Sequence, residues 1–233
     1  EKIMANRPIF IPIIDPDRFV NVVNVEFEWY PGFSVVQKQK SISSLHKSAS
    51  ERGFNSILEI SSKSPYELGV KLSAFNLQLE TLSGQKVSVE AAYQGGKKFE
   101  EGGPYIDLYS LSGREIKKDE RLTSSGELIG FKFNNLKWEL EPKTAFYNWL
   151  YITALMENPE LSEPLLGFDG FSDIEFNPKK SINCQARAAA LYVSLKKQSL
   201  LSKAISSREN YLDIVGSILE NPQQPELPGF PDS

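Results

Sequence analysis

The fold is organised around one stretch in the middle of the chain, Ser88-Val89-Glu90-Ala91-Ala92-Tyr93-Gln94-Gly95-Gly96-Lys97-Lys98-Phe99. Ser88 can cap a helix that starts after it, because its hydroxyl can accept a backbone N–H of the first turn. Helical spacing then puts residues 89, 92, 93 and 96 on one face, and Glu90, Gln94 and Lys97 on another. One face can pack while the other aligns a carboxylate, an amide and an ammonium.

Two consecutive glycines, Gly95 and Gly96, lie inside this predicted helix. Each costs about 1 kcal/mol relative to alanine, so a ligand or a neighbouring helix that approaches closely must offset them. An ordinary amphipathic helix with an acid in its first turn is the alternative interpretation. The stretch therefore needs support from the rest of the sequence.

Length and composition indicate one soluble α+β domain with extensions. The 233 residues are 40% hydrophobic and 24% charged, which is enough to bury a sizeable core. No apolar run of about 18 residues and no signal-peptide core occur, so we expect a cytoplasmic protein without a membrane partner. The single cysteine, Cys184, excludes an intrachain disulfide, and the single histidine, His46, leaves no zinc cluster. We expect no metal and no cofactor, and a structural role for His46.

The charge distribution is uneven. A net charge of −4 argues against the broad electrostatic footprint of a general nucleic-acid binder. Short basic clusters nevertheless occur at Lys97-Lys98, at Lys117-Lys118 with Arg121, and at Lys179-Lys180 with Arg187. They are compatible with one anionic ligand of phosphate type, and equally with a solvated surface.

The first half of the chain predicts mainly strands. Alternating β-branched and aromatic residues favour strands at 8–14 and 20–29, and a third strand is expected at 55–61. A helix is predicted over 37–52, ending at Gly53. A strand at 77–80 and a turn at Ser83-Gly84 precede the organising helix, which we expect to end at Gly102-Gly103-Pro104.

The second half predicts a hairpin followed by helices. Alternating residues on either side of Asn134-Asn135 indicate two strands joined by a tight turn. Helices are predicted from Pro142 to residue 157, over 159–166, from Asn183 to 197, and over 199–219. Residues 167–181 read as a loop rich in reactive side chains, and residues 220–233 as a disordered tail.

The motifs exclude two common nucleotide-binding folds. No G-x-G-x-x-G follows a strand, and no G-x-x-x-x-G-K-[ST] occurs. The remaining inventory of carboxylates, amides, lysines and aromatic residues suits cleavage of a glycosidic bond. A carboxylate there stabilises an oxocarbenium-like centre or activates water, while aromatic rings stack on a base.

Two segments carry a family resemblance. Leu72-Ser73-Ala74-Phe75, followed by Glu90, Gln94 and Lys97, resembles the Leu-Ser-Asn-Phe and Ser-Glu-x-x-x-Gln-x-x-Lys pattern of the NADAR superfamily. Phe171-Ser172-Asp173, with Asn183 ten residues after Asp173, is similar to the Trp-Gly-Asp loop and following Asn of that family. The resemblance covers residues 57–198, so residues 1–56 are expected to be an extension packed on the core and 199–219 a C-terminal helix.

The resemblance implies a single α+β domain, a small mixed sheet packed by helices, and a role for each matching residue. It makes Glu90 and Asp173 catalytic and makes six residues ligand-binding: Ser73, Phe75, Gln94, Lys97, Phe171 and Asn183. Lys118 is expected to bind the ligand as well, because its basic pair with Lys117 can contact a pyrophosphate. Departures from the pattern are Ala74 in place of Asn, Phe171 in place of Trp, and a late loop without its usual glycines.

The resemblance also implies an activity. NADAR proteins are N-glycosidases, some of which remove ADP-ribose from guanine in nucleic acid and so counter ADP-ribosylating toxins. The implied partners are ADP-ribosylated nucleic acid or a ribosylated nucleobase, and a cognate ADP-ribosyltransferase toxin. Alternatives are an N-glycosidase for riboflavin-pathway intermediates and a non-catalytic protein that binds ADP-ribose or a related nucleotide.

Overall fold

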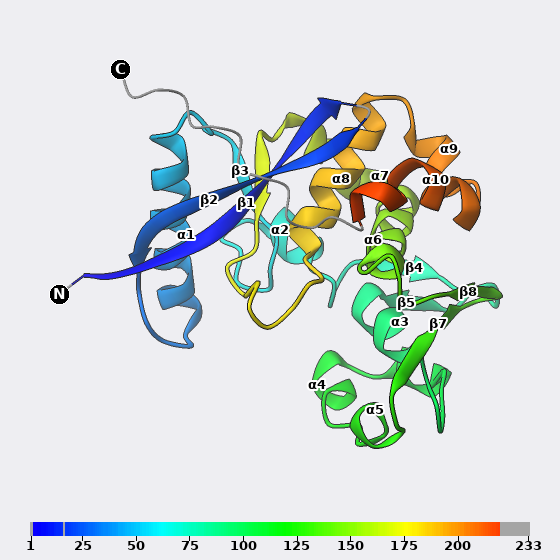
Figure 1. Cartoon of the computed structure of the whole chain (residues 1–233). Coiled ribbons are helices and arrows are strands. Elements are labelled where there is room, and N and C mark those ends of the chain that lie inside the picture. Colours follow the sequence, from blue (N-terminus) through cyan, green and yellow to red (C-terminus); the bar gives the residue numbers. More distant parts are fainter. Residues whose placement is uncertain (1, 16, 220–233) are drawn as a thin grey trace.

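The computed structural model describes residues 2–15 and 17–219 (Figure 1). Its main sheet has the strand order β2-β1-β9-β3. β1 (Ile3–Asp15) and β2 (Arg18–Trp29) form a long antiparallel hairpin, as their alternating residues predicted. β9 (Gly170–Ser172) pairs antiparallel with β1 and parallel with β3 (Ile57–Glu59). The α+β class is therefore confirmed, and residues from both ends of the sequence share one sheet.

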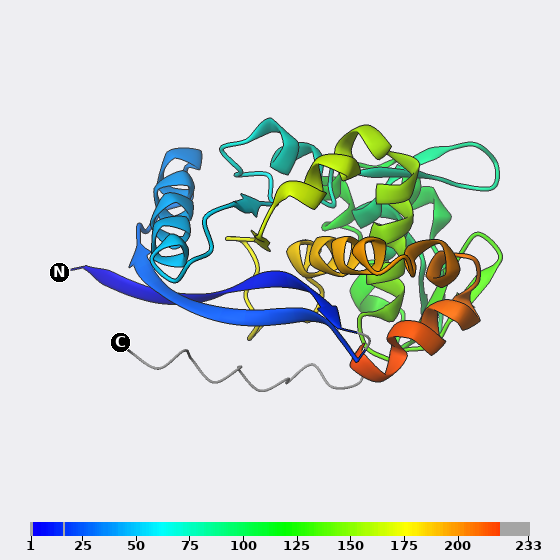
Figure 2. The same cartoon turned by 90° about the horizontal axis from the view of Figure 1, so that it is seen from above.

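Helices cover this sheet. α1 (Val35–Ser50) lies along the hairpin and buries Ile42, Leu45 and Ala49 against it. α8 (Gln185–Lys197) packs against β1, β2 and β9, and also against α6 (Ala145–Glu157), as seen from above in Figure 2. Three consecutive buried alanines at 188–190 let these elements approach α8 closely.

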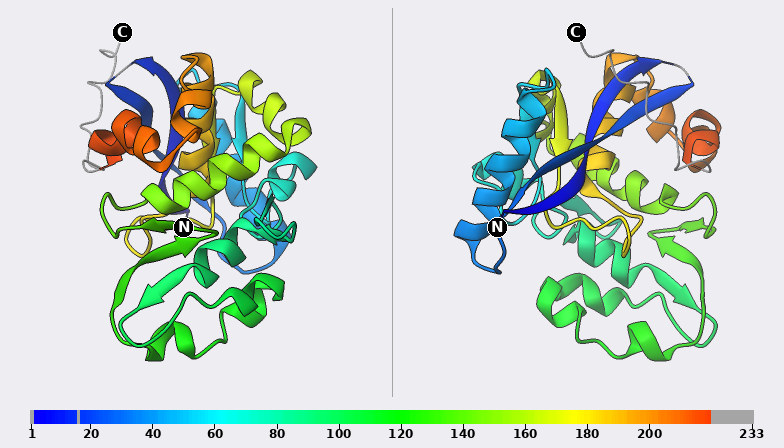
Figure 3. Two further views of the ribbon diagram at one scale, coloured as in Figure 1. Left: turned by 90° about the vertical axis from the view of Figure 1, so that its right-hand side faces the viewer. Right: turned by 60° about the vertical axis from the view of Figure 1, so that its left-hand side comes forward.

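A second group of elements lies below α6 (Figure 3). α3 (Val89–Gly95) contacts α6 and the 3₁₀ helix η1 (Ile106–Ser110). Two small antiparallel sheets complete this part, one of β4 (Gln78–Glu80) with β5 (Lys86–Ser88), and one of β6 (Lys97–Phe99), β7 (Leu128–Phe133) and β8 (Leu136–Trp138). The Asn134-Asn135 hairpin is confirmed, and Asn134 has the left-handed φ of 52° that such a turn requires. The short helices α4 (Gly113–Ile116) and α5 (Arg121–Ser124) lie at the far end.

The organising helix is shorter than the sequence predicted. It ends at Gly95, and Lys97 belongs to the strand β6. The carbonyls of Gly95 and Gly96 accept hydrogen bonds from the backbone N–H groups of Tyr105 and Lys132, both at 2.7 Å, which diverts the chain into β6. A Cβ on Gly95 would lie 2.7 Å from the Tyr109 ring, so the close neighbour that its glycine permits is η1.

Other element boundaries also differ from the prediction. α6 begins at Ala145 instead of Pro142, because Thr144 before it has a left-handed φ of 69°. The expected loop at 167–181 contains the strand β9, and the third strand is confined to residues 57–59. The expected helix over 199–219 is two helices, α9 (Leu201–Ile205) and α10 (Arg208–Leu219).

The remaining helices are short. They are α2 (Glu67–Lys71), α7 (Pro159–Ser162) and the 3₁₀ helix η2 (Glu163–Gly167). The predicted tail at 220–233 lies outside the described residues. Among the described helices, none combines the length and apolar character needed to cross a membrane.

The contact between Gly95 and Tyr109 gives a stability prediction. We expect Gly95→Ala to lower the free energy of unfolding by about 1–3 kcal/mol, because the new methyl group overpacks this contact. Gly167→Ala is the matched control, since no atom lies within 4 Å of a Cβ there. Urea denaturation of both variants measures the difference, and equal stabilities would contradict the packing role of Gly95.

Candidate active site

The first turn of α3 is fixed to a segment that precedes it by some 15 residues. Ser88 caps the helix as predicted, because its Oγ accepts the Ala91 N–H at 3.1 Å. The backbone N–H of Glu90 donates to the carbonyl of Ala74 at 2.9 Å, and that of Val89 donates to Leu77. The segment that carries the Leu-Ser-Ala-Phe motif therefore sets the position of Glu90.

Glu90, Gln94 and Lys97 are brought together, although Lys97 lies outside the helix. Gln94 Nε2 donates to Glu90 Oε1 at 3.1 Å. Lys97 Nζ lies 5.3 Å from the centre of the Tyr93 ring, in cation–π geometry. Burial lowers the pKa of Lys97, and the nearby Glu90 opposes that shift.

Gln185, at the start of α8, connects this group to the late loop. Its Oε1 accepts the backbone N–H of Ala74 at 2.7 Å. Its Nε2 donates to the carbonyl of Ile60 at 2.8 Å and to Asp173 Oδ2 at 3.1 Å. One buried amide thus bonds to the motif segment that positions Glu90 and to Asp173.

Asp173 is buried, and its surroundings favour the protonated acid. Burial raises its pKa first, and the neighbouring Glu59 raises it further. Hydrogen bonds from Gln185 and from the backbone N–H of Glu175, at 3.0 Å, oppose these effects without cancelling them. Asp173 therefore keeps its proton to a higher pH than an ordinary aspartate and can donate it.

Two tyrosines complete the site, and the sequence analysis did not select either of them. Burial raises the pKa of the Tyr147 hydroxyl most, and the neighbouring Tyr151, Glu90, Cys184 and Asp173 raise it further. Its ring meets that of Tyr93 edge-on, with the ring centres 5.4 Å apart. Tyr147 lies on a helix that is buried on nearly all sides, so the spacing of its apolar residues gave no sign of its role.

Asn183, where the sequence predicted that a helix begins, lies before α8 and contacts Tyr93. Its Nδ2 donates to the Tyr93 hydroxyl at 2.9 Å, and the N-cap residue is Cys184. A cavity of about 240 Å³ opens beside this contact, with Tyr93, Tyr147, Phe131, Phe146, Ile182 and Asn183 among its lining residues. Cys184 itself is buried.

A family comparison agrees with this arrangement. The model of a family described as DarT1-associated NADAR antitoxin matches residues 5–224. The chain belongs to this family. A search of curated proteins found no match. The matched range includes the β1–β2 hairpin, α1, α9 and α10, all of which lie outside the stretch of motif resemblance at 57–198.

Four other expected site residues of this NADAR protein lie apart from the contacts described above. Ser73 is fully buried, and Phe171 is packed into the core within β9. Phe75 is 43% exposed. Lys117 Nζ lies over its ring, 5.3 Å from the ring centre. Lys118 is exposed, so Lys117 is the lysine of this pair that reaches the motif segment.

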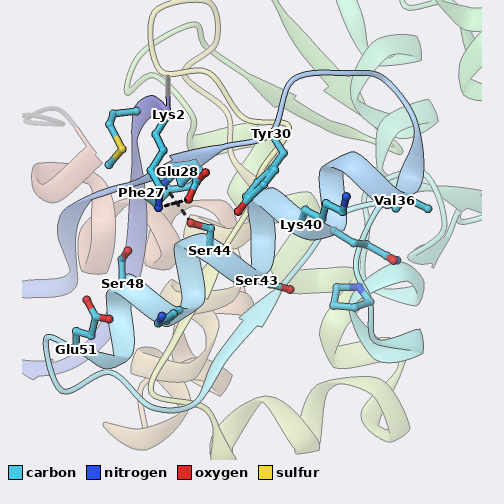
Figure 4. A pocket seen from close by; sticks show the side chains of 14 residues that line it. Lys2, Phe27, Glu28, Tyr30, Val36, Lys40, Ser43, Ser44, Ser48 and Glu51 are labelled. Atoms are coloured by element: carbon cyan, nitrogen blue, oxygen red, sulfur yellow. Dashed lines mark hydrogen bonds and ion pairs between the residues drawn. The ribbon is translucent and has the colours of Figure 1, made fainter.

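A larger hollow lies on another part of the NADAR chain. It measures about 920 Å³ and runs between the β1–β2 hairpin and α1 (Figure 4). Lys2 and Glu28, which form an ion pair at 2.9 Å, both line it. Ser44, also in the lining, accepts the backbone N–H of Glu28 at its Oγ at 3.1 Å. Neither Glu90 nor Asp173 lines this groove.

The histidine gives a pH prediction. His46 Nε2 lies 2.8 Å from Ser172 Oγ, and burial lowers the pKa of His46 from 6.5 to about 4. Between pH 6.5 and pH 4 the unfolded chain binds a proton at His46 that the folded protein does not bind. The free energy of unfolding is therefore highest above pH 6.5 and decreases as the pH falls toward 4. We expect this loss to reach about 3 kcal/mol, at about 1.4 kcal/mol per pKa unit.

Denaturation of the wild type and of His46→Gln between pH 7 and pH 4 measures this loss of unfolding free energy. The buried carboxyl groups titrate in both proteins, so the difference between the two curves reports on the histidine. Parallel curves would contradict the assignment of a partly buried, neutral His46.

Proposed function

We propose that this protein is an N-glycosidase that removes ADP-ribose from modified guanine in nucleic acid, as an antitoxin. The observation that carries the proposal is that two different carboxyl groups, Glu90 and Asp173, both lie within electrostatic reach of Tyr147. Glu90 is held by Gln94 near the lysine Lys97, whereas Asp173 is buried and favours its protonated form. Two carboxyl groups in unlike environments suit division of labour between a stabilising carboxylate and a general acid.

The proposed reaction breaks the bond between C1′ of the ribose and the base nitrogen. Asp173 gives its proton to the departing base, so that the electron pair of the broken bond leaves on a neutral base. The Glu90 carboxylate stabilises the positive charge at C1′ and accepts a proton from the water that attacks it. The products are free ADP-ribose and unmodified guanine still within the nucleic acid, and the reaction consumes one water.

The neighbouring surfaces suit the two ends of such a substrate. Glu90 and Asp173 do not line the cavity beside Tyr93 and Tyr147, but its lining includes four aromatic rings on which a flat base that extends from the two carboxyl groups can stack. Lys97 supplies a positive charge next to Glu90, where a pyrophosphate can pair with it. The family description as a DarT1-associated antitoxin supports an ADP-ribosyltransferase toxin as the source of the modified substrate.

Removing the charge of Glu90 tests the proposal. We expect Glu90→Gln to lower the rate of ADP-ribose release from ADP-ribosylated DNA by about 100-fold or more, while calorimetry shows ADP-ribose still bound. Glu101→Gln, at an exposed position, is the control and should match the wild type. Release at the wild-type rate by Glu90→Gln would rule out the carboxylate mechanism.

The wild type itself separates the alternatives. Release of ADP-ribose from DNA supports the proposal. Cleavage of riboflavin-pathway ribosylamino compounds alone would assign the enzyme to the other substrate class. Binding of ADP-ribose without any turnover would make the protein a binding module.

Lys97 and Lys98 form a matched pair on β6, because successive side chains of a strand point to opposite sides. Lys97 is half-buried over Tyr93, whereas Lys98 is exposed. We expect Lys97→Met to weaken ADP-ribose binding by about 10-fold and to reduce its salt dependence, because one charged contact to phosphate is lost. Calorimetry at two salt concentrations measures both effects. An equal loss in Lys98→Met would show that the effect depends on surface charge in general.

A further inference from the structure

Glu59 is a fully buried carboxyl group that the proposed reaction does not use. It ends the strand β3, and the parallel pairing with β9 sets it in register with Ser172. Its Oε1 accepts the backbone N–H of Ile174 at 2.8 Å, and its Oε2 accepts the Ser172 hydroxyl at 2.5 Å. The two donors are the residues on either side of Asp173.

His46 extends this chain of hydrogen bonds. The Ser172 hydroxyl gives its only proton to Glu59, so the contact of 2.8 Å to His46 is one in which Nε2–H of the histidine donates to Ser172 Oγ. His46 also lines a cavity of about 490 Å³ on the side of α1. The histidine thereby orients the serine hydroxyl toward Glu59.

Glu59 and Asp173 compete for one negative charge. Both are buried, and each raises the cost of ionising the other. Glu59 and Asp173 each accept two hydrogen bonds, but those to Glu59 are shorter, at 2.8 Å from Ile174 and 2.5 Å from Ser172. The bonds to Asp173 measure 3.0 Å from Glu175 and 3.1 Å from Gln185. Hydrogen bonds from donors favour the ionised form, so the charge is better stabilised on Glu59.

Other titratable groups around the pair do not alter this order. Tyr147 and Tyr151 of α6 and Cys184 before α8 face Asp173, and burial raises the pKa of all three, so they are neutral near pH 7. Glu175 acts on both carboxyl groups but is exposed and lies 3.4 Å from Lys38 of α1. Water and the lysine screen its charge.

We propose that Glu59 is a positioning residue that carries the single negative charge of the pair and so keeps the proton on Asp173, ready for the departing base. The inference rests on the proposed function, because a proton kept on Asp173 has a role only if Asp173 acts as a general acid. The order of ionisation, however, is a property of the ligand-free protein and is measurable without any substrate.

Carbon-13 NMR of the ligand-free protein, labelled at aspartate and glutamate side-chain carboxyl carbons, measures that order. Asp173→Asn and Glu59→Gln assign the two signals. We expect the Glu59 carbon to reach its carboxylate shift at lower pH than the Asp173 carbon. In Glu59→Gln the Asp173 midpoint should fall by about one pH unit or more, because the neighbouring negative charge is gone.

Glu175→Gln is the matched control, since it removes a carboxylate from the same loop at an exposed position, and the Asp173 midpoint should fall by much less than in Glu59→Gln. An Asp173 midpoint unchanged in Glu59→Gln would overturn the proposal. The proposal would also be overturned if, in the wild type, the carboxyl group of Asp173 ionised at a lower pH than that of Glu59. This result needs only the wild-type protein and the assignment from Asp173→Asn.

The rate of ADP-ribose release provides the second readout. In Glu59→Gln the decline of the rate at high pH should move to lower pH by the same shift that NMR records, with rates near those of the wild type at the acid end of the range. A uniform loss at every pH would mean that Glu59 only supports the fold. Absence of release in the wild type would contradict the proposed function, while the NMR order of ionisation would still decide the arrangement of charge.

Discussion

The side-chain amide of Gln185 is the interaction on which the site depends. Its three hydrogen bonds connect the start of α8 to the end of β3, to the motif segment at Ala74 and to Asp173. These groups are buried, and each one left without a partner would cost about 1–3 kcal/mol. Since Ala74 in turn accepts the Glu90 N–H, the positions of both proposed catalytic carboxyl groups follow from this one amide.

The packing of α8 against its neighbours positions the Gln185 amide. The small side chains of α8 allow the β1–β2 hairpin on one side and α6 on the other to come close, which fixes the N-terminal end of the helix over the site (Figure 2). The parallel pairing of β3 with β9 then sets Glu59 beside the residues that flank Asp173. A short internal sheet thus determines the electrostatic surroundings of the site.

Much of the fold was predictable because it depends on neighbours in the sequence. The β1–β2 hairpin, the Asn134-Asn135 turn, the helix α1 and the Ser88 cap all follow from alternation, turn chemistry or capping. The errors arose where distant groups compete for the same backbone. α3 ends early because the backbone N–H groups of Tyr105 and Lys132 donate to the carbonyls at its C-terminal end. Asn183 donates to Tyr93 instead of bonding to the helix that follows it.

The sequence by itself determined the resemblance to the NADAR pattern and the contact of Glu90 with Gln94, since a spacing of four residues on a helix brings two side chains together. Only the tertiary structure decided that Phe171 is core, that Tyr147 and Gln185 belong to the site, and that Asp173 is buried beside Glu59. The reason is physical. The ease with which a carboxyl group ionises depends on the water excluded from it and the charges around it, and here both are supplied by strands and helices far away in the chain.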